Sequence, residues 1–542
     1  MPLVLHNTLG GSLMPFIPLH DRKVTFYTCG PTVYDYAHIG NFRSFLVADL
    51  LRRWLESPLC ECVGPRDSAN QGTPTGVFGY HVTHVMNITD VGHMTDDASA
   101  DGAGLDKMEE ATKRLLEDKK SGRLPEGATG ATGKPLDPTD PYDIAAYYTR
   151  AFIDDAKRLR LKVALDAEHD PTCMPHATQS IKGMLQLILQ LLNQNHAYLA
   201  EDGACYFDTQ SFPDYGALSG NTVEALRAGA GERVSDFNQR AKRSPADFLL
   251  WKPDRTHLMR WDPRRVCADD QKAVAILDRF PLHEGYPGWH IECSAMALAR
   301  LGPRIDLHSG GEDNIFPHHE CELAQSRCAN HTDQLASFWI HGRFLRVEGQ
   351  KMSKSKGNFF TARQLFAKGF SPTTVRLELI KTHYRSNSNF TEQGLIDASK
   401  QIDRWRTFLQ SAEQSPTPGV RNDSVATKFA DAMNNDLNIA EALGVLNSWT
   451  RDTTAPTQAD AQLIRDFDTV LALLEPEDLP TDTSHAGGPD DAYIDDLVRR
   501  RTTARAEKNW PEADRLRDEL AALEVEVTDT PTGPTWRRRA TL

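Results

Sequence analysis

The order of three segments near the start of the chain constrains the fold more than any other feature. Residues 23–30 (KVTFYTCG) form a short β-rich run that leads through a turn into residues 38–56, where apolar side chains recur at helical spacing. Residues 80–90 (YHVTHVMNITD) return to strand character. This order predicts a β-α-β unit, and we expect the polar, Gly-rich residues 64–79 to loop out from it without touching the sheet.

The rest of the chain alternates between ordered and irregular segments. Residues 121–141 and 226–285 have the composition of loops, and residues 476–490 have that of a domain linker. From residue 373 onward most of the periodicity is helical. A chain of 542 residues is long enough for three or four domains, so we expect an interrupted α/β body followed by an all-α tail.

The composition argues against a membrane protein and against a disulfide scaffold. The longest apolar run, MLQLILQLL at residues 184–192, is about half of what a membrane-spanning helix requires, and residues 1–11 lack the features of a signal peptide. Nine cysteines, an odd number, in a chain without an export signal indicate reduced thiols, some of them metal ligands. We therefore expect a cytoplasmic protein that does not associate with a membrane.

The net charge of −14 argues against a surface covered with phosphate contacts, although local basic patches can still bind nucleic acid. Three consecutive arginines occur at residues 499–501 and again at 537–539, the second time beside Trp536. These groups fit either a nucleic-acid contact or solvated helix faces and a frayed tail. The residues alone leave both interpretations open.

The stretch FPHHECELA places two histidines, a cysteine and two glutamates within nine residues. On a helix, side chains three and four positions apart share a face, so His318 can act together with Glu322 or with Cys321, whereas His319 and Glu320 point elsewhere. Two ligands rarely make a metal site. The remaining ligands must therefore come from distant segments.

Two other motifs suit a polyphosphate. HIGN, residues 38–41, begins the predicted helix directly after a strand and a turn, where free backbone N–H groups favour phosphate. Gly40 lets a nucleotide approach the backbone and His38 can donate to phosphate oxygens, although a histidine that only caps the helix fits as well. KMSKSKGN, residues 351–358, is a cationic loop suited to neutralising a leaving pyrophosphate, or else an exposed loop without function.

Together and in this order, the two motifs resemble the two signatures of the class I aminoacyl-tRNA synthetases, and KMSKS matches the second signature letter for letter. Within that class the chain is most similar to the cysteinyl-tRNA synthetase family. The resemblance covers nearly all of the chain and rests on the segments YTCGPTVYDYAHIGN, NITD, YFD, DFLLWK, PGWHIECSAM, DLHSGGED, FPHHECELAQS, KMSKSKGNFFT and TWRR.

The resemblance implies an α/β fold class: a doubly wound parallel-sheet (Rossmann-like) catalytic domain with insertions, followed by an all-α C-terminal anticodon-binding region. The expected boundaries are residues 1–135 for the first half of the catalytic domain, 136–285 for a connective insertion, 286–345 for the second half with the zinc site, 346–415 for the KMSKS loop and stem-contact region, 416–480 for a helical anticodon-binding bundle and 491–542 for a small C-terminal tRNA-binding domain.

The implied reaction is the ATP-dependent activation of L-cysteine to cysteinyl-adenylate, followed by transfer to the 3′-terminal adenosine of tRNA-Cys through its 2′-OH. The partners are then tRNA-Cys, ATP and L-cysteine, and we expect a monomer. One alternative is a ligase that couples cysteine to an amino sugar in thiol biosynthesis, which the C-terminal third disfavours. The other is a tRNA-binding paralogue without catalysis, which the intact motifs disfavour.

The family places one zinc ion per chain on two cysteines, a histidine and a glutamate, which correspond to Cys29, Cys293, His318 and Glu322. Helical spacing alone allows either Glu322 or Cys321 to act with His318, and the resemblance selects Glu322. Without the resemblance, Cys29 and Cys293 would each fit an inert buried thiol. Thiolate binds zinc strongly whereas a serine hydroxyl stays protonated, so such a site can reject serine by roughly 10⁴ to 10⁵ without an editing domain. Four protein ligands normally close a zinc site, so the substrate enters as a fifth ligand or displaces Glu322.

The resemblance also assigns the substrate contacts. Thr89, Trp289 and His290 lie beside the substrate cysteine, although Trp289 equally suits core packing. Asn41 stands where the class consensus has histidine, so its amide must supply any hydrogen bond expected there. The implied ATP-binding residues are His38, Gly40, Asn41, Gly310, Gly311, Asp313 and Lys354.

The implied chemistry needs no protein nucleophile. The cysteine carboxylate attacks the α-phosphate of ATP, which is used with Mg²⁺, while His38 and Lys354 stabilise the pentavalent phosphorus and the departing pyrophosphate. Lys351 assists them.

The segment TWRR carries the expected tRNA contacts. Trp536 is expected to stack on an anticodon base, and Arg537 and Arg538 to contact phosphate. His93 lies in a long acidic segment to which the resemblance assigns no role, and we expect a surface loop there.

Overall fold

The computed structural model describes residues 2–92, 94–96, 103–125, 127–221, 241–353, 357–475, 491–507, 509–523, 525–530 and 533–538. The expected linker at 476–490, the expected loop residue His93 and the predicted catalytic Lys354 lie outside these residues.

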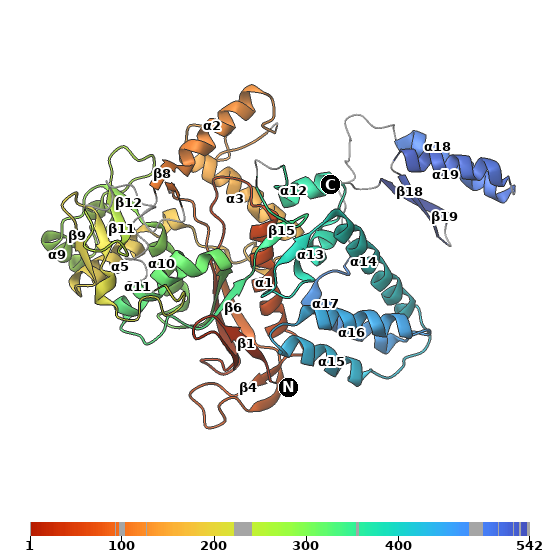
Figure 1. Ribbon diagram of the computed structural model, residues 1–542, viewed down its shortest axis with the longest axis horizontal. Helices are drawn as coiled ribbons and strands as arrows, with labels where there is room; N and C mark the ends of the chain where they lie inside the picture. The colour runs from red at the N-terminus through yellow and green to blue at the C-terminus, as the bar shows by residue number, and fades with distance from the viewer. Residues whose placement is uncertain are drawn as a thin grey trace.

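A four-stranded parallel sheet forms the centre of the molecule (Figure 1). Its strands are β3 (Lys23–Thr28), β6 (His81–Met86), β13 (Ile305–Gly311) and β14 (Ala336–Gly342), in the order β14-β13-β3-β6. The chain runs outward from β3 to β6 and then returns to the other side of β3, which makes the sheet doubly wound, as predicted. Ligands of such sheets bind beyond the carboxyl ends of the strands where the order reverses, which here is between β3 and β13.

Helices cover both faces of this sheet. Helix α1 (Ile39–Leu55) connects β3 to β6 and shares a core with Phe26, whereas the next residue of β3, Tyr27, lies in a second core with α10 (Trp289–Leu301). Successive strand residues point to opposite faces, so this alternation is what a sheet buried on both sides requires. The predicted β-α-β unit is therefore confirmed.

Two segments expected to be irregular contain regular structure. Within the insert 64–79, β5 (Pro74–Phe78) pairs with β4 (Glu61–Val63) in a hairpin separate from the central sheet. Residues 226–240 of the loop predicted over 226–285 lie outside the described residues. The prediction is wrong from residue 248 onward, where the chain forms β11 (Phe248–Pro253) and two short helices, α8 (Pro263–Val266) and α9 (Gln271–Arg279).

The polar residues that suggested a loop in this second segment begin these helices. The side chains of Asp262 and Asp270 accept hydrogen bonds from backbone N–H groups of the first turns of α8 and α9. Strand β11 belongs to a four-stranded antiparallel sheet with β9 (Ala197–Leu199), β10 (Cys205–Phe207) and β12 (Gly285–Pro287).

From residue 392 to residue 523, the regular elements among the described residues are helices. Helices α14 (Glu392–Glu413), α15 (Asp423–Asn434), α16 (Ile439–Asp452) and α17 (Gln458–Leu471) share one apolar core. Helices α18 (Asp491–Ala506) and α19 (Trp510–Ala522) follow.

The expectation of an all-α tail is wrong at its end, where β18 (Val525–Thr530) and β19 (Gly533–Arg538) form an antiparallel hairpin. The β-branched and aromatic residues of these two runs favour strands over helix.

The remaining elements connect these parts. They are β1 (Val4–Asn7), β2 (Ser12–Pro15), β7 (Met94–Asp96), β8 (Ala103–Asp106), α2 (Lys107–Lys120), α3 (Pro141–Arg158), α4 (Lys162–Asp166), α5 (Ile181–Asn193), α11 (Glu320–Asn330), β15 (Leu345–Val347), β16 (Gln350–Lys351), α12 (Ala362–Ala367), α13 (Pro372–Ile380) and β17 (Ser388–Phe390). Within the described parts of the chain, no helix is long and apolar enough to cross a bilayer.

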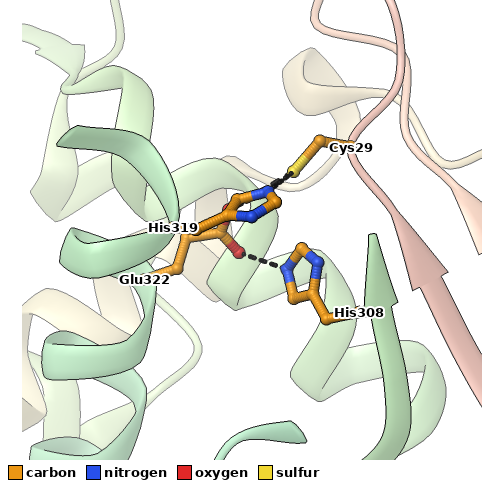
Figure 2. Close-up of side chains that lie close together, drawn as sticks. All are labelled: Cys29, His308, His319 and Glu322. Atoms are coloured by element: carbon orange, nitrogen blue, oxygen red, sulfur yellow. Dashed lines mark hydrogen bonds and ion pairs between the residues drawn. The ribbon is translucent and has the colours of Figure 1, made fainter. Parts of the chain in front are cut away.

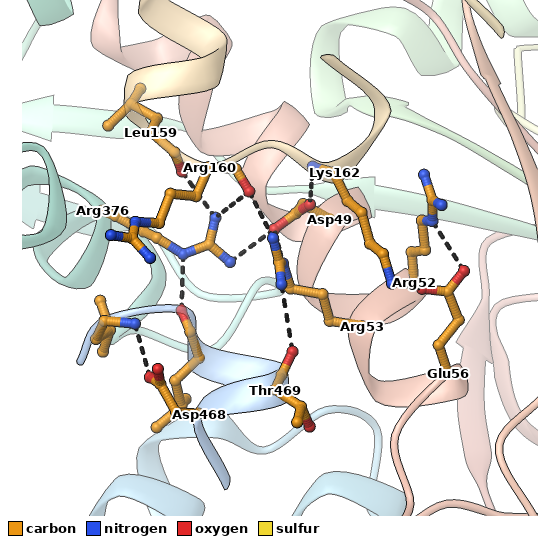
Figure 3. A network of polar contacts seen from close by, with 12 residues as sticks. Asp49, Arg52, Arg53, Glu56, Leu159, Arg160, Lys162, Arg376, Asp468 and Thr469 are labelled. Carbon is orange, nitrogen blue, oxygen red and sulfur yellow. Dashed lines mark hydrogen bonds and ion pairs between the residues drawn. The ribbon is translucent and has the colours of Figure 1, made fainter. Parts of the chain in front are cut away.

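A buried polar network joins α1 to the helical bundle (Figure 3). The guanidinium of Arg376, on α13, donates to Asp49 Oδ2 at 2.6 Å and to the carbonyl of Leu471, at the end of α17, at 2.7 Å. Burial alone would raise the pKa of Asp49, but Arg53 and Arg376 hold it below its ordinary value. An ionised pair thus fixes the helix that begins at HIGN against the bundle.

Candidate metal and nucleotide-binding site

Four side chains converge just beyond the carboxyl end of β3. Cys29 follows β3, Cys293 lies on α10, His318 lies in the turn before α11, and Glu322 lies on α11. All four are buried, and one ligand atom from each lies within 4.8 Å of the others. The four positions that the resemblance assigned to zinc are therefore together in space, although Cys29 and Cys293 are 264 residues apart in sequence.

The donor chemistry and spacing fit a tetrahedral zinc ion. The two sulfur atoms lie 3.7 Å apart, Cys29 Sγ lies 3.3 Å from Glu322 Oε1, and His318 Nε2 lies 3.0 Å from the same oxygen. Ligand atoms about 2.3 Å from a common centre lie roughly 3.7 Å apart in a tetrahedron. Two thiols, an imidazole and a carboxylate are also ligand types that zinc accepts.

The charges in the cluster favour a cation. Burial alone would raise the pKa of Glu322, but His308 and His318 hold it well below its ordinary value, so the carboxylate is ionised. Burial alone would lower the pKa of His318, yet Glu322 and Cys293 raise it to about 10. The cavity therefore attracts positive charge, which a divalent ion would supply.

His290 and Trp289 both contact His318. His290 Nδ1 lies 3.0 Å from His318 Nδ1, and the indole of Trp289 stacks on the His318 ring with centroids 4.2 Å apart. Thr89 is also buried nearby. Asn87 Nδ2 donates a hydrogen bond to its hydroxyl at 3.0 Å, and Asn87 Oδ1 lies 3.6 Å from Cys293 Sγ. The three predicted cysteine-binding residues thus surround the cluster.

Two histidines that sequence reasoning did not assign to the site also lie in it (Figure 2). His319 Nε2 lies 3.2 Å from Cys29 Sγ, and His308 Nε2 lies 3.0 Å from Glu322 Oε2. The prediction that His319 points elsewhere is wrong: His319 and Glu322 are three positions apart, a spacing that can share a helix face, and His319 Nε2 lies 3.9 Å from Glu322 Oε1.

The rest of that helical prediction holds. Glu320 points away from the cluster and accepts hydrogen bonds from the backbone N–H groups of Gly216, Leu218 and Ser219. The His-His pair in FPHHECELA and the position of His308 in the strand-like run before two glycines were the signals available for the two missed histidines.

The HIGN motif begins α1, as predicted, and His38 caps the helix. Its ring accepts a hydrogen bond from Asn41 N at 3.2 Å, while Asn41 Oδ1 accepts one from His38 N at 3.1 Å. Asn41, which departs from the class consensus, thus completes a reciprocal cap.

The two signatures lie against each other in space. A Cβ atom added to Gly40 would lie 3.1 Å from Cε of Met352, the second residue of KMSKSKGN. Ile39 N donates to the carbonyl of Phe360, just beyond that motif, at 3.0 Å. Lys351 is exposed at the end of β16.

The HSGGED segment ends β13 beside the metal cluster. A Cβ atom on Gly310 would lie 2.7 Å from the His319 ring, and one on Gly311 would lie 2.3 Å from Asp313 Oδ1. Gly310 is therefore required by the position of His319, apart from any nucleotide. The predicted tRNA-contact residues Trp536, Arg537 and Arg538 lie on β19.

Two family models match the chain. One is described as the catalytic domain of class I (C) tRNA synthetases and matches residues 15–62 and 74–400, so the unmatched stretch lies in the β4–β5 hairpin. The other is described as the cysteinyl-tRNA ligase anticodon binding domain and matches residues 491–537. The second match argues against the amino-sugar ligase.

Relatives match the chain over its whole length. A cysteine–tRNA ligase of Salinibacter ruber is 38% identical over 99% of this chain and 98% of its own, and one of Koribacter versatilis is 34% identical over 99% and 100%. A solved methionyl-tRNA synthetase of Mycobacterium tuberculosis, bound by methionyl-adenylate, is 13% identical with a TM-score of 0.45, covering 85% of this chain and 92% of that one. The full-length relatives and the two family models show that this chain belongs to the cysteine–tRNA ligase family of class I aminoacyl-tRNA synthetases.

Proposed function

We propose that this protein activates L-cysteine with ATP, transfers it to tRNA-Cys, and selects its amino acid with one zinc ion held by Cys29, Cys293, His318 and Glu322. The observation that carries the proposal is the convergence of these four buried donor atoms beyond β3, at the reversal point of the doubly wound sheet. When bound there, zinc supplies a Lewis-acid centre that prefers a thiolate to a hydroxyl, which is the chemical difference between cysteine and serine.

The chain's own residues complete the proposed substrate site. His290 orients His318 through the bond between their Nδ1 atoms, and the Trp289 indole forms a wall that excludes larger side chains. Thr89 lies next to Asn87 and Glu292 and is proposed to bind the substrate amino acid.

ATP, used with Mg²⁺, is proposed to lie across the N-terminus of α1. Gly40, at the start of α1, lets the phosphates approach the backbone, Gly310 and Gly311 admit the adenine and ribose, and Asp313 accepts a hydrogen bond from a ribose hydroxyl. Gly40 and Asn41 shape the start of the helix. His38, Lys351 and Lys354 stabilise the charge that develops on the phosphates.

The tRNA contacts are proposed on the C-terminal hairpin. Trp536 stacks on an anticodon base, and Arg537 and Arg538 contact phosphate. We propose that the domain boundaries expected from the family apply, and that the protein is a cytoplasmic monomer.

Three measurements on purified protein test the proposal. Elemental analysis should find zinc, and cysteine, but not serine, should support exchange of pyrophosphate into ATP. Trp536→Ala should raise the KM for tRNA-Cys while leaving the exchange rate unchanged. Protein without metal that still discriminates cysteine from serine would overturn the zinc assignment, and exchange without transfer to tRNA would overturn the proposed overall reaction.

A further inference from the structure

The metal cavity contains more ligand atoms than the zinc site uses. Cys29 and Glu322 are shared by two groups of four buried residues, and in the second group their partners are His308 and His319. The ligand atoms of this second group also lie within 4.8 Å of one another (Figure 2). The two groups therefore share one thiol and one carboxylate. They differ in their other two ligands, which are Cys293 and His318 in the first group and His308 and His319 in the second.

His319 is held in the orientation of a metal ligand. Its Nδ1 lies 2.7 Å from His341 Nε2, and His341 Nδ1 lies 2.7 Å from the hydroxyl of Thr8. This chain of hydrogen bonds fixes the ring so that Nε2 faces Cys29 Sγ, which is how supporting groups orient metal-binding histidines. The glycine at position 310 leaves the space that the ring occupies.

The second pair of ligands is chemically suited to the same ion. Two imidazoles, a thiol and a carboxylate are ligand types that zinc accepts, and His319 Nε2 lies 3.2 Å from the shared Cys29 Sγ. His308 Nε2 already faces the shared Glu322 carboxylate at 3.0 Å.

We propose that Cys29, His308, His319 and Glu322 form a second ligand set for a divalent ion, overlapping the first set at Cys29 and Glu322. This inference rests on the proposed function, because it assumes that the first set binds metal. Its consequence is an asymmetry among the ligands. Loss of Cys293 or His318 leaves the second set intact, whereas loss of Cys29 or Glu322 leaves only three ligands in either set.

A six-donor cavity also bears on substrate entry. Four protein ligands close a tetrahedral zinc site, so an incoming thiolate must replace a ligand or raise the coordination number. With six donors in reach, a ligand that the substrate displaces is replaceable by another protein donor, so the ion is retained.

The test uses Co²⁺ as the probe, because thiolate ligation gives it a strong absorption that scales with the number of bound sulfurs. Cys293→Ala and Cys29→Ala are matched, since both remove one buried thiol from the full-length protein. Cys293→Ala should keep stoichiometric cobalt with roughly half the thiolate absorption and an affinity lowered about 10–100-fold, whereas Cys29→Ala should lose binding far more completely. His318→Gln should retain cobalt in the same way and serves if Cys293→Ala does not fold.

A second experiment removes His308 and His319, the two histidines that only the second ligand set uses. His308→Gln with His319→Gln should lower the cobalt affinity of the wild-type chain by no more than about 10–100-fold, because His308 also supports Glu322, but should abolish cobalt binding when added to Cys293→Ala. Equal loss of cobalt from Cys29→Ala and Cys293→Ala, with both folded by circular dichroism, would overturn the second set. Absence of metal from the wild-type protein would instead overturn the proposed function, so the two failures are distinguishable.

Discussion

Met352 of the second class signature lies directly over Gly40 of the first. A Cβ atom at position 40 would lie 3.1 Å from Met352 Cε and 2.9 Å from the His38 ring. The close approach of these two segments, more than 300 residues apart in sequence, therefore depends on the missing side chain.

The first prediction follows from this contact. Gly40→Ala should displace Met352 and the His38 ring, and with them the groups proposed to bind ATP. We expect cysteine-dependent pyrophosphate exchange to fall about 10-fold or more, since small misplacements of positioning groups have effects of this size. The control is Gly444→Ala, on α16, where an added Cβ meets no atom within 4 Å. This variant should leave the rate of pyrophosphate exchange unchanged.

The second prediction concerns the support of the metal ligands. His290→Ala removes the partner of His318 Nδ1 but no proposed zinc ligand. Zinc affinity, measured by competition with a chelator, should fall about 10–100-fold. His169→Ala, at an exposed position, should leave affinity unchanged. Equal affinities of all three proteins would show that the His290 contact does not orient the ligand.

The third prediction concerns the buried ion pair between α1 and α13. Arg376→Met leaves Asp49 buried without its closest guanidinium, and we expect a loss of about 2–4 kcal/mol in the free energy of unfolding, measured with urea. Arg404→Met, an exposed arginine on α14, is the control. If Arg376→Met leaves the free energy of unfolding unchanged, the network does not stabilise the fold.

The fourth prediction is a pH dependence of stability. Burial raises the pKa of Glu378 from 4.5 to about 7, even though Lys381 Nζ lies 2.5 Å from Oε2. A folded-state pKa above the unfolded value stabilises the protein below pH 4.5, and this contribution is lost as the pH rises through about 7.

The variant Glu378→Gln is neutral at every pH and should remove this dependence. The wild type should therefore lose up to about 3 kcal/mol between pH 5 and 8 relative to the variant, which thermal unfolding at the two pH values can detect. Exposed Glu201→Gln should keep the wild-type trend. Parallel curves for all three proteins would contradict the burial argument.

Local sequence was sufficient for the parts of the fold that are formed by neighbouring residues. The helical spacing of 38–56 between two β-rich runs predicted the β-α-β unit. Spacing left His318 with either Glu322 or Cys321, and the structure has the contact with Glu322, at 3.0 Å. The helices that begin at Asp262 and Asp270 were missed because a capping aspartate and a loop aspartate have the same local composition.

The sequence by itself determined the parallel-sheet body, the helical bundle and, through family resemblance, four candidate zinc ligands. Only the tertiary structure decided that His308 and His319 share their cavity. The spacing of His319 and Glu322 lets them share a helix face, but only the fold brings Cys29 and His308 to that face. Because Cys29 and His319 meet across 290 residues, no local pattern could encode their contact.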